Sequence, residues 1–502
     1  MTPQRAYDEL LRLSRDLNVF ASCADLLEWD EETFMPPGAV AHRGEQRAAL
    51  AGLLHDRAVD PRWNDLLAAV EGSALVADPD SPIAATVREL RREHDRQVRL
   101  PRRLVEEQAR VTTLAQRAWT EAREESDFSR LLPHLQRIVA LAREQAAVSG
   151  HPGPAYDALL DHYEPGATGQ AVASLMASLG AALRPLVQAI AAKRRPRAAL
   201  LKREFPVDRQ RLFAQAVAAA LGFDLERGRL DIGAHPFCIA LGPGDTRMAV
   251  RFSDRAFAEG FFFLLHEVGH GLYEQGLDTA HAGTPLGRPA SIGLHESQAR
   301  LWENQIGRGL PFWKHFFPRL KNVFPEALGT ARLDAFHAAI NRIEVSPLRA
   351  QADELTYNLH IWVRFDLERD MVEGRLDPKD LPEAWRAAYR ARLGVEPASD
   401  ADGCLQDGHW AEGLLGYFPT YTLGNVYAAQ LIAAARRDLP DLDDAMARGD
   451  FSPLLLWLRA KVHVHGQRFR PDALIQRIAG GPPDHAPLVR ALDDKYRTLY
   501  NL

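Results

Sequence analysis

The sequence predicts a mainly α-helical protein with one small β-sheet. Apolar residues recur at spacings of three and four over long stretches such as 6–29 and 84–125, as they do in amphipathic helices. One segment, 228–252, instead alternates β-branched and aromatic residues around a Gly-Pro-Gly-Asp turn, which is typical of an antiparallel hairpin. No internal repeat, low-complexity tract or flexible linker interrupts 1–502, so we expect a single catalytic domain, with two helical lobes around a groove as one possible arrangement.

The helical pattern breaks where turn-forming residues gather. The first predicted helix ends before Met-Pro-Pro-Gly at 35–38, because proline removes a backbone donor and restricts the residue that precedes it. The charged face of 84–125 is interpreted as solvated helix. Alanine, the strongest helix former, is enriched in two later segments, 171–194 and 214–221. Beyond the predicted strands the chain is again helical, with breaks near 281–290, 307–311 and 397–408.

Composition and charge exclude several classes of protein. A net charge of -6 over 502 residues gives no basic footprint for nucleic acid. Three scattered cysteines are too few for a disulfide scaffold and indicate a reducing compartment. The N-terminus lacks the apolar core of a signal peptide. The longest apolar candidate, 171–183, is shorter than the ~18 residues of a membrane span, so we expect a cytoplasmic protein without a membrane partner.

The segment 261–276 carries two histidines and a glutamate inside an apolar, helix-like run. His266 and His270 are four residues apart, so on a helix they point the same way and can share one zinc ion. Glu267 lies about 100° round the helix, where it can act as general base on a metal-bound water without ligating the metal. One apolar stripe would anchor this helix in the core: Phe261, Leu264, Leu265, Val268 and Leu272.

The same pattern also arises by chance on an ordinary amphipathic helix. With 18 histidines in the chain, chance produces it in roughly one such sequence in twenty. Gly269 and Gly271 favour the functional interpretation, because each costs a helix interior about 1 kcal/mol relative to alanine. A helix that lets a substrate or another backbone approach closely gains from such glycines, whereas a purely structural helix gains nothing.

A catalytic zinc ion needs a third protein ligand, and the segment 261–276 does not supply it. The extended motif that ends in a third histidine is excluded, because Tyr273 and Gly276 occupy its last two fixed positions. Glu274 lies on the same helical face as His266, but about 12 Å further along the axis, too far for both to reach one ion.

The third ligand is therefore expected from another helix, and 291–307 is the obvious candidate. Ser291 has the character of an N-cap, which places Glu296 in an early turn. Glu296 is the preferred ligand, and Glu303, two turns later, is the second choice. His295 points about 100° away from Glu296, which suits a supporting residue, a substrate contact or simple packing.

These two segments resemble the carboxypeptidase Taq family of metallocarboxypeptidases, and several further motifs extend the resemblance over most of the chain. They stand in the order WDEETFMPPG at 29–38, HPF at 235–237, DTRMAVRF at 245–252, HEVGH at 266–270, HESQ at 295–298, LRAQADE at 348–354, GCLQDGHW at 403–410 and GYFPTYTLGN at 416–425. Two positions depart from the family pattern. Ala249 stands where the family's DxRxT has threonine, which removes a hydroxyl, and Leu348 conservatively replaces isoleucine.

The resemblance implies a function and a site. By it, His266, His270 and Glu296 are the zinc ligands and Glu267 is the catalytic base and acid. The family fold is mostly helical, with a deep substrate groove and a small sheet beside the metal. Family members remove single C-terminal residues with broad specificity and are often dimers, so we expect a homodimer that acts on peptides with a free C-terminus. One Zn²⁺ per chain is expected, with Co²⁺ as a substitute.

Recognition of a terminal carboxylate favours arginine, which can donate two parallel hydrogen bonds. The candidates are Arg349, Arg247 and Arg251, and the resemblance favours Arg349. The alternative interpretation of Arg349 is a structural ion pair, for example with Asp353 four residues later.

Attack on a peptide carbonyl builds an oxyanion that needs hydrogen-bond donors. His409 and Tyr421 are the candidates, although His409 could instead cap a turn among packed aromatic residues. His235 is expected on the sheet facing the groove, near a strand edge that could pair with an extended peptide. An ordinary hydrogen-bonded histidine is an equally good interpretation of His235.

The sequence thus predicts a zinc metallocarboxypeptidase in which Glu267 takes a proton from zinc-bound water and passes it to the leaving amine. One rival is a metallo-oligopeptidase or dipeptide-releasing peptidase with the same zinc chemistry. A second rival is a non-catalytic protein with a structural zinc site or peptide groove. Glu267 argues against the second rival, because a structural site has no need of a non-ligating carboxylate.

Overall fold

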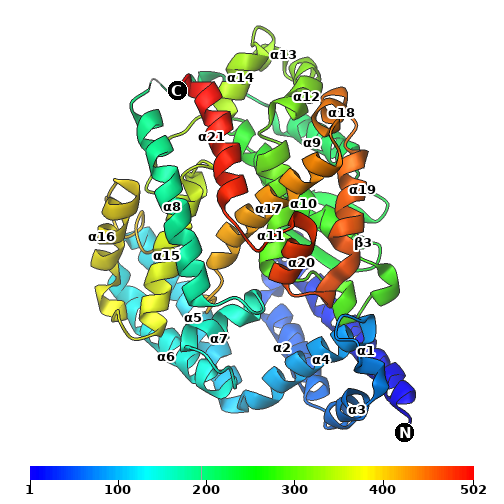
Figure 1. Cartoon of the computed structure of the whole chain (residues 1–502). Helices are drawn as coiled ribbons and strands as arrows, with labels where there is room; N and C mark the ends of the chain where they lie inside the picture. The colour runs from blue at the N-terminus through cyan, green and yellow to red at the C-terminus, as the bar shows by residue number, and fades with distance from the viewer. Residues whose placement is uncertain (194, 234) are drawn as a thin grey trace. The chain divides into compact units, whose positions relative to one another are not determined.

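The computed structural model describes residues 1–193, 195–233 and 235–502, and the fold is mainly helical (Figure 1). Over these residues the only sheet has three strands. The chain divides into two compact units. Unit 1 comprises Met1–Gln97, Pro196–Asn341 and Ala428–Pro482, and unit 2 comprises Val98–Arg195, Arg342–Tyr427 and Pro483–Leu502. The mainly α fold with a small sheet beside the HExxH helix is confirmed, whereas the substrate groove remains a prediction.

Unit 1 contains the sheet and the HExxH helix. Its helices are α1 (Pro3–Thr33), α2 (Val40–Ala58), α3 (Arg62–Glu71), α4 (Pro82–Arg99), α9 (Val207–Leu221), α10 (Phe257–Glu274), α11 (Ile292–Arg300), α12 (Leu310–Val323), α13 (Pro325–Leu328), α14 (Leu333–Ile340), α18 (Leu442–Arg448), α19 (Ser452–Lys461) and α20 (Pro471–Ala479). Thr2 caps α1 by accepting a hydrogen bond from the Arg5 N–H. The helix ends at Thr33, just before the predicted break at 35–38.

The strands lie where the sequence places them, but the sheet is mixed rather than wholly antiparallel. The order is β1 (Gly228–Ile232), β3 (Asp245–Val250), β2 (Phe237–Gly242). The predicted hairpin is the antiparallel β2–β3 pair, and Gly244 in its turn has φ +84. β1 pairs with β3 in parallel. The prediction missed this because β3 inserts between β1 and β2, which run in opposite directions, and periodicity cannot show strand order.

Helix α10 is anchored by the predicted apolar stripe, since all five stripe residues are at most 2% exposed. The two glycines of α10 meet close neighbours. A Cβ on Gly269 would lie 2.6 Å from the Ala299 Cα and from the Gln298 carbonyl oxygen, both on α11. A Cβ on Gly271 would lie 2.7 Å from the ring of Phe223. Gly269 therefore serves the close approach of another backbone, which is one of the two roles predicted for these glycines, whereas Gly271 leaves room for an aromatic side chain.

The regular secondary structure of unit 2 is helical, with no strand among its described residues. Its helices are α5 (Arg102–Glu125), α6 (Leu132–Val148), α7 (Ala155–Tyr163), α8 (Gly169–Ala191), α15 (Tyr357–Val372), α16 (Leu381–Leu393) and α21 (Ala486–Tyr500), and the division between the units falls within α4 and α17 (Pro419–Asp438). Helix α15 buries four polar side chains, those of Asn358, His360, Arg364 and Glu368, to 2% exposure or less. Because buried polar groups are normally hydrogen-bonded, we expect these four side chains to take part in a hydrogen-bond network.

Helix α8 corrects one expectation from the sequence. It is the one helix among the described residues that is long and apolar enough to cross a membrane by length and composition. Such a helix is weak support for a membrane span, because a buried core helix passes the same test. In this chain α8 packs against α15: a Cβ on Gly180 would lie 2.3 Å from the Trp362 ring.

Replacing Gly269 with alanine should lower the free energy of unfolding by about 1–3 kcal/mol, because α11 must move to admit the methyl group. The variant should also bind zinc more weakly, since α11 carries Glu296. Gly44→Ala is the matched control, because a Cβ on this α2 glycine meets nothing within 4 Å and should raise stability by up to about 1 kcal/mol. Denaturant unfolding of both variants checks this, and equal effects would contradict the close-approach account.

Candidate active site

Helices α10 and α11 lie side by side within unit 1 (Figure 1). They bring two histidines and a glutamate together. The Nε2 atoms of His266 and His270 are 3.2 Å apart. The Oε2 atom of Glu296 lies 3.5 Å from the His266 Nε2 and 3.8 Å from the His270 Nε2. Ser291 caps α11 as predicted, accepting a hydrogen bond from the Leu294 N–H. This cap fixes the start of the helix that carries Glu296.

The three ligand atoms have the spacing of a zinc site. Four donors at ~2.0–2.1 Å around a tetrahedral zinc ion are separated from one another by about 3.3 Å. The observed separations of 3.2, 3.5 and 3.8 Å lie close to that value. Two imidazoles and one carboxylate are also the donor set of many catalytic zinc sites. The residues therefore fit the metal that the sequence predicts.

Glu303, the second choice as ligand, lies behind the site instead. Its Oε2 is 3.0 Å from the His266 Nδ1, on the opposite side of the ring from Nε2. It belongs to a π-helical turn, Leu301–Ile306, that continues α11. Arg300 joins the two carboxylates by donating from Nε to Glu296 (2.6 Å) and from Nη1 to Glu303 (3.1 Å). A carboxylate on Nδ1 fixes the ring orientation and leaves Nε2 for a metal.

His270 is held in a different way. Its Nδ1 is buried and has no hydrogen-bond partner among the residues that the structure describes. The ring stacks instead on His295, with centroids 4.2 Å apart and planes 15° apart. The His295 Nε2 in turn lies 2.9 Å from the Glu274 Oε1. His295 is thus a supporting residue, and Glu274 contributes through it although it is too far away to be a ligand itself.

Glu267 is 4% exposed and stands outside the group of three potential ligands. Burial raises its pKa to about 7, with a further contribution from the negative charge of Glu296. The neighbouring imidazoles act in the opposite direction. A carboxyl group whose pKa lies near neutrality can both accept and return a proton, as a general base requires.

The other predicted substrate residues of unit 1 are not members of the group of potential ligands. Arg247 donates from both Nε and Nη2 to Asp245, at 2.8 Å each, and its guanidinium lies over the Trp29 ring. The WDEETFMPPG segment therefore packs on the DTRMAVRF strand. Arg251 and His235 are exposed. The structure assigns neither of them a hydrogen-bond partner among the described residues, and their predicted roles remain untested.

The remaining predicted residues form a second cluster, within unit 2. The His409 Nε2 lies 3.0 Å from the Tyr421 hydroxyl, and the His409 ring stacks on Phe418. Burial and the positive charge of Arg349 lower the pKa of His409 to about 4, so the ring is neutral near pH 7. The guanidinium of Arg349 lies 5.5 Å from the centroid of the Tyr421 ring. The sequence thus selected three residues, Arg349, His409 and Tyr421, that the fold brings together.

Arg349 is ion-paired, but its partner is Asp407 and not the predicted Asp353. Its Nη2 lies 2.7 Å from the Asp407 Oδ1. Asp353 instead accepts hydrogen bonds from the backbone N–H groups of Leu355, Thr356 and Glu344. It turns away because its carboxylate caps the turn before α15, a local role that competes with an ion pair.

Glu368 on α15 anchors the loop that carries His409. Its carboxylate accepts hydrogen bonds from the Tyr156 hydroxyl and from the Trp410 indole (3.0 Å). Burial raises the pKa of Glu368 to about 8, although these hydrogen bonds lower it. Trp410 and Phe418 are at most 4% exposed, so they are packing residues, as the alternative interpretation held. His409, between them, remains bonded to Tyr421.

Comparison with known proteins identifies the family. The family model for carboxypeptidase Taq (M32) metallopeptidases matches residues 9–496. The chain belongs to the carboxypeptidase Taq (M32) family. It is 48% identical to thermostable carboxypeptidase 1 of Thermus thermophilus over all of both chains, and 34% identical to carboxypeptidase 1 of Bacillus subtilis over 98% of each. The solved M32 carboxypeptidase of Deinococcus radiodurans is 40% identical and superposes with a TM-score of 0.96 over 99% of this chain and 100% of that one. The chain is thus a carboxypeptidase, a hydrolase of the peptidase class.

Sequence reasoning missed three residues of this M32 carboxypeptidase site. Arg300 could have been found, because it follows Glu296 by four residues and precedes Glu303 by three, the spacings of helical ion pairs. Asp407 stands in the GCLQDGHW motif, but nothing local shows that it binds Arg349. Arg364, on α15, carries no motif signal, and only its complete burial reveals it.

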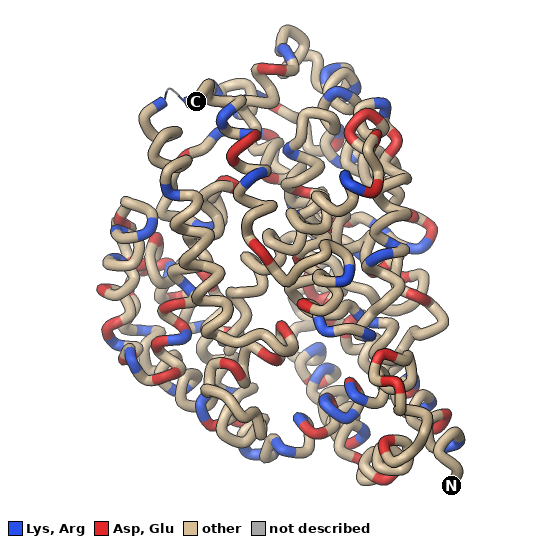
Figure 2. The backbone as a smooth tube through the Cα atoms, viewed as in Figure 1, with Lys and Arg blue, Asp and Glu red and all other residues tan. Residues whose placement is uncertain are grey.

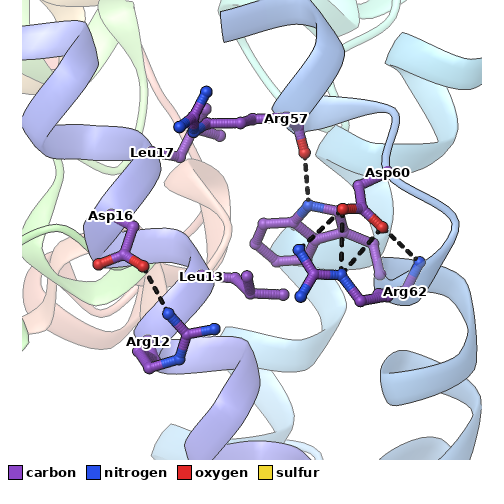
Figure 3. A pocket seen from close by; sticks show the side chains of 8 residues that line it. Arg12, Leu13, Asp16, Leu17, Arg57, Asp60 and Arg62 are labelled. Carbon is purple, nitrogen blue, oxygen red and sulfur yellow. Dashed lines mark hydrogen bonds and ion pairs between the residues drawn. The ribbon is translucent and has the colours of Figure 1, made fainter. Parts of the chain in front are cut away.

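A separate cavity of about 190 Å³ lies in the N-terminal helices (Figure 3). Two local ion pairs lie among its lining residues, Arg12 with Asp16 and Arg62 with Asp60. The Trp63 indole donates a hydrogen bond to the Arg57 carbonyl. None of the M32 motif residues lines it. Acidic and basic residues are interspersed along the chain in the view of Figure 2. Neither feature suggests a second binding site.

Glu303→Gln should weaken zinc binding by about 10-fold or more, because a neutral amide orients and polarises His266 less well than a carboxylate. Glu296→Gln should weaken it further, since a ligand charge is lost. Glu259→Gln, an exposed position on the same α10 helix, is the control and should bind zinc as the wild type does. Competition with a chromogenic chelator measures the affinities. Wild-type affinity in Glu303→Gln would contradict the orienting role.

The buried Glu368 should make stability depend on pH. Its folded-state pKa of about 8 lies above the ordinary glutamate value of 4.5, so the native state holds a proton that the unfolded state releases. Its contribution is therefore complete below pH 4.5 and is lost as pH rises towards about 8, by about 1.4 kcal/mol per pH unit. Glu368→Gln should reduce the pH dependence of stability by this amount in urea unfolding measured between pH 5 and 8. Parallel slopes for the two proteins would show that Glu368 is ionised in the native state.

Proposed function

We propose that this M32 carboxypeptidase is zinc-dependent and removes single residues from peptide C-termini with broad specificity. The observation that carries the proposal is the group formed by His266, His270 and Glu296 at zinc-site spacings, with the buried Glu267 beside it. His266, His270 and Glu296 would hold the ion. When bound, zinc polarises the scissile carbonyl and increases the acidity of a water ligand.

In this proposal Glu267 handles the proton. Its carboxylate accepts a proton as the peptide bond is attacked and returns it to the leaving amine, so one group acts as base and then as acid. Burial excludes bulk water from this carboxylate and keeps its pKa near neutrality.

Recognition of the substrate is proposed for the cluster in unit 2. Arg349 would bind the terminal carboxylate, because a guanidinium offers paired donors at one end. Either His409 or Tyr421 would donate to the developing oxyanion, because the hydrogen bond between them uses the proton of one of the two. That hydrogen bond orients both groups, and the low pKa of His409 keeps its ring neutral at pH 7. Arg247 and His235 keep their predicted roles as substrate contacts on and beside the sheet.

Three further parts complete the proposal: cobalt substitution and the dimer rest on the family resemblance, and the location and partners rest on composition and charge. Cobalt would substitute for zinc, because it accepts the same ligands in a similar geometry. The protein would act in the cytoplasm on peptides, with no nucleic-acid or membrane partner, and would form a homodimer. Sedimentation equilibrium tests the dimer, and a single species at the 55.9 kDa chain mass would contradict it.

A short peptide with a free C-terminus should be shortened one residue at a time, whereas the same peptide with an amidated C-terminus should stay intact. Mass spectrometry of both peptides, with and without a chelator, measures this. Zinc or cobalt added after chelation should restore the activity. Internal cleavage of both peptides would favour the rival metallo-oligopeptidase and would remove the role given to Arg349.

Glu267→Gln is the matched variant for the catalytic step. It should lower kcat by about 10²- to 10⁴-fold while zinc content stays at the wild-type level, because Glu267 is not a ligand. A variant that loses zinc together with activity would show instead that Glu267 helps to hold the metal.

A further inference from the structure

Asp407 binds two arginines at once. Its Oδ1 accepts from the Arg349 Nη2 (2.7 Å) and Nε (2.9 Å), and its Oδ2 lies 2.5 Å and 2.6 Å from the Arg364 Nη2 and Nε. Each arginine therefore donates from the Nε–Nη2 edge of its guanidinium, and the two arginines bind different oxygens of the carboxylate. Each oxygen of the carboxylate therefore accepts two N–H groups, and these four hydrogen bonds use its full capacity as an acceptor.

The preceding residue, Gln406, holds the same two arginines. Its Oε1 accepts from the Arg349 backbone N–H (2.9 Å) and from the Arg364 Nη2 (2.8 Å). Its amide nitrogen donates to the carbonyls of Pro347 and Asp402. Arg349 is thus fixed at its backbone and at its side chain by two consecutive residues of the GCLQDGHW motif, while Arg364 ties that motif to α15.

The cluster carries a net positive charge. Two guanidiniums and one carboxylate sum to +1, and the neighbouring His409 is neutral near pH 7. The arginines also donate to the hydroxyls of Tyr357 and Tyr389 and to the His360 carbonyl, which add no charge. The Arg364 side chain is 0% exposed, whereas that of Arg349 is 16% exposed. Of the two arginines, only Arg349 can therefore bring the net positive charge of the cluster into contact with a ligand.

The neighbours of Arg349 also fix the orientation of its guanidinium group. Asp407 occupies its Nε–Nη2 edge, Tyr357 accepts from Nη1 at 3.2 Å, and the Tyr421 ring lies against its face. The Nη1–Nη2 end of the fork then faces away from Asp407, and this end also matches a carboxylate. Without Arg364, the Arg349–Asp407 pair would orient the guanidinium in the same way. The pair would have no net charge, however, and would not attract the carboxylate of a ligand.

We propose that Arg364 is a positioning residue for recognition of the substrate's C-terminal carboxylate: by sharing Asp407 it leaves Arg349 with an uncompensated positive charge. This inference rests on the proposed carboxylate-binding role of Arg349. Arg364 acts without touching the substrate. Removing it should therefore weaken substrate binding, which raises KM, without removing any group that takes part in bond cleavage.

A double-mutant cycle tests the proposal on an N-blocked dipeptide with the zinc-loaded enzyme. Arg349→Met and Arg364→Met should each raise KM about 10-fold or more, with kcat changed less than about 3-fold. The double variant should be no worse than Arg349→Met alone, because Arg364 acts only through Arg349. Arg369→Met, an arginine on the same helix that pairs with Glu373, is the control and should leave KM unchanged.

Two outcomes separate this inference from the proposed function. If Arg349→Met leaves KM unchanged, Arg349 does not bind the carboxylate and both ideas fall. If Arg349→Met raises KM while Arg364→Met leaves it unchanged, or if the two effects multiply in the double variant, the function stands and the charge-sharing role of Arg364 is wrong.

Arg364→Lys keeps the test decisive if Arg364→Met does not fold, as its complete burial makes conceivable. Lysine preserves the charge but loses the fork. Charge sharing predicts a KM within about 3-fold of wild type, whereas a purely structural role of the fork predicts a KM as high as that of Arg349→Met. Unfolding midpoints of all variants show whether each is compared as a folded protein.

Discussion

The close approach of α11 to α10 at Gly269 is the constraint on which the metal site depends. Any side chain at this position would overlap the backbone of Gln298 and Ala299. With the two backbones in contact, a short glutamate on α11 reaches the Nε2 atoms of two histidines on α10. The glycine weakens its own helix by about 1 kcal/mol. It is retained where it stands because the distance between the helices sets the distances between the ligands.

Buried charges in this protein are shared rather than paired one to one. Arg300 serves both Glu296 and Glu303, and together with the imidazoles it holds the pKa of Glu296 well below its usual range despite burial. Asp407 serves two arginines in the same way. Sharing satisfies the donors and acceptors that burial removes from water. It also fixes how much charge each cluster retains.

The two clusters differ in the charge that remains. Around the predicted ligands, carboxylates outnumber arginines, as suits a site that holds a cation. Around Arg349, guanidiniums outnumber carboxylates, as suits a site that receives an anion. Each cluster combines a motif residue with partners outside the motif, such as Glu274 behind His295 and Arg364 behind Asp407. Sequence motifs therefore identify the residues proposed to contact ligands more readily than the residues that orient those contacts.

The choice of Glu296 as the partner of His266 and His270 came from its predicted helix together with the family resemblance, and the contact between α10 and α11 brings the three together. The sequence by itself determined the helical class, the positions of the strands, the buried stripe of α10 and the N-cap at Ser291. All of these follow from local periodicity, capping and helical spacing, which act over a few residues. The tertiary structure decided the parallel pairing of β1 with β3, the place of Glu303 behind His266, and the choice of Asp407 over Asp353 as the partner of Arg349. Each of these joins residues distant in sequence, and such pairings depend on how whole elements pack, which no local pattern records.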